Sequence, residues 1–139
     1  MEYTGKMQFV NSSMMESISG TVTHIACAYP YDTGDPSDYY SKDILTFANL
    51  ADGEGDKSTV RTGSVAISTE SSKYDLWVVA VTWHDALFGN MGFSNTFECG
   101  FEGVDSGGTV QIIMDGPSSE VTVKFPSSLS SNCSKSWAL

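Results

Sequence analysis

The sequence predicts an all-β protein: a two-layer antiparallel β-sandwich formed by a single domain over residues 1–139. Short apolar or alternating runs recur between turn residues, which is typical of sandwiches and barrels. Glycine and β-branched residues are frequent, and no long segment keeps the 3.6-residue period of a helix. A hydrophobic fraction of 40% with 17% charged residues is typical of one globular domain that buries its own core.

The clearest predicted strand is 121–125, where Val121, Val123 and Phe125 alternate with Thr122 and Lys124. Alternate side chains of a strand point to opposite faces of the sheet. The three apolar residues are therefore expected in the core, and the two polar ones in solvent.

The other strands follow from the same patterns. Residues 110–114 form a strand that a turn at 115–119 connects to the first, as in a hairpin. The segment 76–83 is apolar on both faces, so we expect a central strand that is covered on both sides. Further strands are expected at 7–10, 21–28, 44–50, 59–67 and 92–99, which makes about eight in all.

The charge balance limits the partners that the chain can bind. It holds 17 acidic and 7 basic residues, a net charge of −10, and the basic residues are scattered. Nucleic acids require a basic surface, and anionic membranes repel an acidic one, so both are excluded as partners. Neutral lipids, glycans and proteins remain.

Two further observations predict the location. No apolar run approaches the ~20 residues of a membrane-spanning helix, so no transmembrane segment is expected. The N-terminal residues show no apolar stretch typical of a secretory signal, which predicts a cytoplasmic protein.

The three cysteines, Cys27, Cys99 and Cys133, have no metal-ligand spacing. We interpret them as free thiols, with Cys27 and Cys99 packing in or beside apolar strands. A bridge between Cys99 and Cys133 is the alternative if the protein meets an oxidising compartment.

No arrangement of residues predicts catalysis. His24 shares its strand face with Val22 and Ala26, which favours a structural histidine, and His84 lies beside Asp85 at a strand end. There is no G-x-S-x-G motif. We therefore expect no enzymatic activity and no catalytic residues.

No metal or cofactor is expected either. The acids of 32–38 and 52–56 alternate loosely, but Lys57 and Gly63 stand where a calcium-binding loop of the EF-hand type needs glycine and glutamate.

The candidate binding residues are four tyrosines around one acidic turn. Tyrosine is enriched in binding interfaces because it offers a rigid surface that is both apolar and polar. The alternative is that these rings pack against the edge of the sandwich. The candidates are Tyr29, Tyr31, Asp35, Tyr39 and Tyr40.

Several segments resemble the PUD family, small nematode proteins whose abundance rises when insulin-like signalling is reduced. The resemblance lies in DLWVVAV at 75–81 and SNTFEC at 94–99, with similar segments at 9–12, 22–24, 105–113 and 125–133. It covers most of the chain but not residues 29–57.

The resemblance implies a β-sandwich similar to the aegerolysins and a dimer, hetero- or homodimeric, with a related chain. The function expected is non-catalytic association between proteins in the cytoplasm, with an abundance linked to insulin-like signalling and ageing. The alternative is recognition of a membrane lipid such as a sphingolipid, or of a glycan, by analogy with the aegerolysin fold.

Overall fold

The computed structural model describes residues 3–27, 39–53, 65–69, 75–101, 103–127 and 132–137. These residues form nine strands and one short 3-10 turn, Gly103–Asp105. The strands are β1 (Tyr3–Ser12), β2 (Ser17–Cys27), β3 (Tyr39–Ala51), β4 (Val65–Thr69), β5 (Leu76–Asp85), β6 (Gly89–Glu98), β7 (Thr109–Asp115), β8 (Glu120–Lys124) and β9 (Cys133–Ser136).

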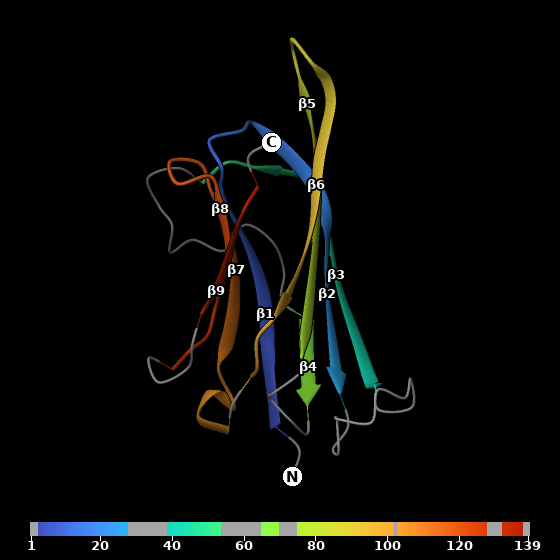
Figure 1. Cartoon of the computed structure of the whole chain (residues 1–139), viewed down its shortest axis with the longest axis vertical. Coiled ribbons are helices and arrows are strands. Elements are labelled where there is room, and N and C mark those ends of the chain that lie inside the picture. Colours follow the sequence, from blue (N-terminus) through green and yellow to red (C-terminus); the bar gives the residue numbers. More distant parts are fainter. Residues whose placement is uncertain are drawn as a thin grey trace.

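The strands form two sheets, as the sequence predicts. A five-stranded sheet has the order β4-β1-β7-β8-β9, and a four-stranded sheet has the order β3-β2-β5-β6. Figure 1 shows them as two layers, with β1, β7, β8 and β9 in one and β2, β3, β5 and β6 in the other. The predicted β-sandwich is confirmed.

Two features of the structure go beyond the predicted sandwich. The pairing is not antiparallel throughout, because β1 and β7 are parallel. Parallel neighbours need a long crossover, and here the crossover includes the whole four-stranded sheet, which no local pattern indicates. The strand β9 is also missing from the prediction, because its residues CSKS are short and polar. Part of the predicted strand at 59–67, residues 59–64, lies outside the described residues.

The core lies between the sheets. Val121 and Val123 are fully buried and Phe125 is 4% exposed, as their alternation predicts. Lys124 is exposed, and Thr122 is half-buried. The largest fully buried side chains from both sheets are Trp77, Phe9, Phe97, Phe101, Met7 and Ile18.

A buried asparagine ties the two sheets together near one end. Asn11 of β1 donates from Nδ2 to the carbonyl of Leu50 in β3, at 3.0 Å. Its Oδ1 accepts hydrogen bonds from the backbone N–H of Ser13 at 3.0 Å and from the Ser13 hydroxyl at 2.6 Å. The buried amide therefore has the partners that a polar group in a core needs.

The C-terminal residues dock on the body through Trp137. The indole of Trp137 donates to the carbonyl of Asp115 at 3.0 Å. Its ring packs edge-on against Trp83, with centroids 5.8 Å apart, and stacks on Phe93.

Cys99 and Cys133 form a disulfide, which corrects the expectation of free thiols at these two positions. Cys99 follows β6 and Cys133 begins β9, and these edge strands of the two sheets lie together, with Cα atoms 6.3 Å apart at the cysteines. A hydrogen bond from Asn95 to the carbonyl of Ser136 and one from Lys135 to the carbonyl of Thr96 join the same edges. Sequence spacing alone does not reveal that two edges from different sheets meet. The side chain of Cys27 lies outside the described residues.

This disulfide makes a testable prediction. When the protein is alkylated at the moment of lysis and digested without reductant, mass spectrometry should recover the Cys99 and Cys133 peptides joined. Prior reduction should release both peptides in alkylated form. Recovery of both thiols alkylated without reduction would contradict the disulfide in the cell.

Candidate functional site

The predicted binding residues fall mostly outside the part of the chain that the structure describes. Tyr29, Tyr31 and Asp35 lie there entirely. Tyr39 and Tyr40 begin β3, but their side chains are not among those described. The tyrosine-lined surface therefore stays a prediction.

A different surface has unusual composition: the side of the four-stranded sheet that is turned away from the core, here called the outer face. Opposite residues of antiparallel strands share a face, so the strand register defines three rows at its centre, and the row Ser19-Thr82-Gly92 continues the face toward the β5–β6 hairpin. From β3 through β2 and β5 to β6, the rows are Thr46-Thr21-Ala80-Ser94, Ile44-Thr23-Val78-Thr96 and Lys42-Ile25-Leu76-Glu98.

The outer face is nearly free of charge. Two rows hold no ionisable residue, and Lys42 and Glu98 stand at opposite ends of the third. Ile44 is 50% exposed, and Val78 is half-buried, although no third layer formed by the described residues covers them. A sheet face in water is normally polar, so these apolar side chains indicate a contact surface.

The corresponding face of the five-stranded sheet differs. Lys6, Lys124, Asp115 and Glu120 alternate with the buried residues of β1, β7 and β8, so charges of both signs are spread over it. That composition is typical of a solvated surface. The contrast distinguishes the outer face from the ordinary surface of the same molecule.

The sequence contains a signal for the outer face. The segment 76–83 is apolar on both sides, which predicts that both sides are covered. In the structure, Trp77, Val79 and Val81 point into the core, while Leu76 and Val78 belong to the outer face. The expectation is wrong for the described residues, because a strand of a two-layer sandwich has only one covered side.

The β5–β6 hairpin projects beyond the rest of its sheet. The last pairing of β2 with β5 joins Ile18 and Trp83, whereas β5 and β6 continue together to Asp85 and Gly89 (Figure 1). The turn exposes two large apolar side chains, Leu87 at 86% and Phe88 at 74%.

Asp85 shapes the hairpin turn. Its Oδ1 accepts hydrogen bonds from the backbone N–H groups of Leu87 at 2.8 Å and Phe88 at 2.9 Å. These backbone hydrogen bonds lower the pKa of Asp85 below its ordinary value, and the bond from Phe88 has the larger effect. The carboxylate of Asp85 therefore stabilises this turn fully at pH values above the ordinary pKa of aspartate. The stabilisation is lost as the pH falls through the lowered pKa.

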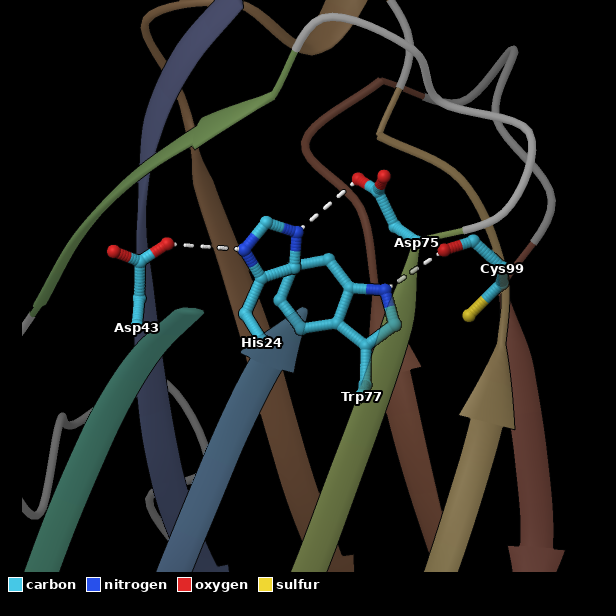
Figure 2. Close-up of polar contacts among 5 residues, drawn as sticks. All are labelled: His24, Asp43, Asp75, Trp77 and Cys99. Atoms are coloured by element: carbon cyan, nitrogen blue, oxygen red, sulfur yellow. Dashed lines mark hydrogen bonds and ion pairs between the residues drawn. The ribbon is translucent and has the colours of Figure 1, made fainter. Parts of the chain in front are cut away.

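His24 is buried between two carboxylates, as Figure 2 shows. Its Nδ1 lies 3.2 Å from Asp43 Oδ2, and its Nε2 lies 3.1 Å from Asp75 Oδ2. Asp75 is fully buried, whereas the Asp43 side chain is 22% exposed. The imidazole also packs on Trp77, with centroids 4.3 Å apart, and the Trp77 indole donates to the carbonyl of Cys99 at 2.7 Å.

This network has the geometry of a structural site. Each ring nitrogen of His24 has a carboxylate oxygen within hydrogen-bond distance. Both nitrogens are therefore occupied, and neither is open to a substrate. The predicted position of His24, on the buried face with Val22 and Ala26, is confirmed. Its two carboxylate partners were not predicted, because they lie 19 and 51 residues away in the sequence.

The second histidine lies on the surface. His84 is exposed on the projecting hairpin, with Nδ1 3.3 Å from Asn90 Oδ1. The described ranges contain no group of three or more His, Cys, Asp or Glu residues placed to hold a metal ion. They also contain no helix that is long and apolar enough to cross a membrane.

Comparisons of the chain with protein-family models, with curated proteins and with solved structures found no match.

Proposed function

We propose that the chain is a non-catalytic β-sandwich protein that acts by associating with a second, related β-sandwich chain through the outer face. The observation that carries the proposal is a nearly uncharged, partly apolar face on a chain whose net charge is −10. Two strongly acidic chains repel each other over most of their surfaces. Contact through faces without acidic clusters avoids that repulsion and buries the apolar side chains.

The two charges of the outer face support a symmetric pairing. Consider a two-fold axis that lies between two such faces and runs parallel to the central strands. This axis reverses the order of the strands in the partner. Lys42 at one end of its row then faces the partner's Glu98, and the second copy of this contact forms on the other side. An isologous interface of this kind is self-complementary.

The outer face is also large enough for a stable contact. Four strands about 4.8 Å apart, paired over about eight residues of 3.3 Å each, cover roughly 500 Å² per chain. Two such faces bury about 1,000 Å² in total, which is the lower limit for a specific protein interface. Stacked sheets pack about 10 Å apart with their side chains interdigitated.

Sedimentation of a charged variant tests the association. Val78→Lys places an ammonium group at the centre of the outer face, and we expect it to weaken dimerisation at least tenfold, about 1.4 kcal/mol. The matched control is Thr122→Lys, which adds the same charge to the outward side of β8 and should leave dimerisation unchanged. The runs should include the chain alone and the chain with a co-expressed relative. Single-chain masses in every run at micromolar concentration would contradict the proposal.

The PUD-like identity of the partner, and an abundance linked to insulin-like signalling and ageing, remain parts of the proposal that rest on the resemblance. The cytoplasmic location is also a proposal. The Cys99–Cys133 disulfide bears on it, because such bonds persist mainly in oxidising compartments. The alkylation experiment above therefore also tests the location: a disulfide present at lysis argues against the cytoplasm.

A further inference from the structure

A cavity of about 830 Å³ lies at one end of the four-stranded sheet, below the projecting hairpin. Its walls come from the start of β2, from Asn49 near the end of β3, and from the base of the β5–β6 hairpin. Met15, Trp83 and Met91 supply the apolar part. The polar part consists of Glu16, Ser17, Ser19, Asn49, Thr82, His84 and Asn90.

Local hydrogen bonds hold two of the polar groups in place. Asn49 has a left-handed backbone conformation, with φ of 53°, and its N–H donates to the Ser19 hydroxyl at 3.0 Å. A non-glycine residue in this conformation is uncommon, and such residues cluster at functional sites. The contact of His84 Nδ1 with Asn90 Oδ1 uses the amide oxygen, which leaves the amide N–H group of Asn90 available as a donor.

The lining selects the chemistry of a ligand. Among the described residues, no lysine or arginine lines the cavity and Glu16 does, so anions are disfavoured. A purely apolar ligand would leave hydroxyl and amide groups without partners when it excludes water. A ligand dense in hydroxyl groups both donates and accepts, and so matches amides, hydroxyls and one carboxylate. The C–H surface of a sugar also suits Met15, since binding sites combine apolar walls with a few polar groups.

From this lining we infer that the cavity binds a neutral saccharide. This inference goes beyond the association through the outer face, and the cavity adjoins that face, because Ser19, Thr82 and Gly92 continue its rows. Asn90 and Glu16 contact the hydroxyl groups, Asn90 as a donor and Glu16 as an acceptor. The exposed positions of both side chains mean that either can be changed without disturbing the core.

The test uses the whole chain and a defined panel of probes: glucose, galactose, mannose and N-acetylglucosamine, free and as neutral oligosaccharides on an array. Ligand-observed NMR titration should show saturable binding of at least one of these sugars. Asn90→Ala and Glu16→Gln should each weaken it tenfold or more. Gln111→Ala, which removes an amide from the outward side of β7, should leave it unchanged.

Three results would overturn the inference. One is no saturable binding of any sugar on the panel. Another is equal binding by Asn90→Ala, Glu16→Gln and the unmodified chain, with thermal unfolding showing that the variants are folded. The third is binding to phosphatidylcholine vesicles that Asn90→Ala abolishes, without binding of any sugar, because the cavity would then hold a lipid headgroup. Dimerisation measured on the same samples reports on the outer face separately.

Discussion

Replacing His24 with alanine should lower the free energy of unfolding by about 2–4 kcal/mol, since it removes a fully buried, hydrogen-bonded ring and leaves a cavity in its place. The substitution removes the ring that lies 3.1 Å from Asp75 and 3.2 Å from Asp43. Asp75 is fully buried, so its carboxylate loses this partner in a place that water does not reach. The ring contact with Trp77 is lost as well.

The chain offers a matched control for this prediction. His84→Ala removes the same side chain from an exposed position on the hairpin and should change the free energy of unfolding by about 0.5 kcal/mol or less. Chemical denaturation of the three proteins, with urea, measures the difference. Equal stability of the His24 and His84 variants would show that the buried network contributes nothing to the fold.

The fold class was predictable because the pattern that specifies a strand is local. Val121, Val123 and Phe125 alternate with polar residues within five positions, and the structure buries all three. The parallel pairing of β1 with β7 was not predictable in the same way. It joins residues about 100 positions apart, and alternation within either strand is the same for parallel and antiparallel neighbours.

The surfaces that carry the proposals were harder to predict for the same physical reason. Each row of the outer face takes one residue from each of four strands, so its lack of charge exists only once the register is known. The cavity likewise combines Glu16, Asn49 and Asn90, which the sequence places far apart. The disulfide needs two edge strands of different sheets to meet. Residue patterns within a segment do not contain this information.

Asp43 connects the buried His24 to the surface of the protein. A second cavity, of about 420 Å³, is lined by Asp43 together with Lys6 and Ile67. Asp43 thus links this cavity to His24 in the core. Because the Asp43 carboxylate already contacts His24, we assign this carboxylate a role in stability, which the His24→Ala variant tests.

Val123→Asp should destabilise the protein by about 4 kcal/mol or more, a large share of the 5–15 kcal/mol that stabilises a typical domain. Val123 is fully buried and pairs with Ile112 on one side and Cys133 on the other, so the new carboxylate would lie in the core without a charged partner. Thr122→Asp is the control, because it adds the same group one residue away on the outward side of β8. It should cost about 1 kcal/mol or less. Val123→Thr keeps the shape of valine and should lower the free energy of unfolding by about 1–3 kcal/mol. The stability of this variant can be measured even if the aspartate variant does not fold. Equal melting temperatures for the Val123→Asp and Thr122→Asp variants would contradict the assignment of Val123 to the core.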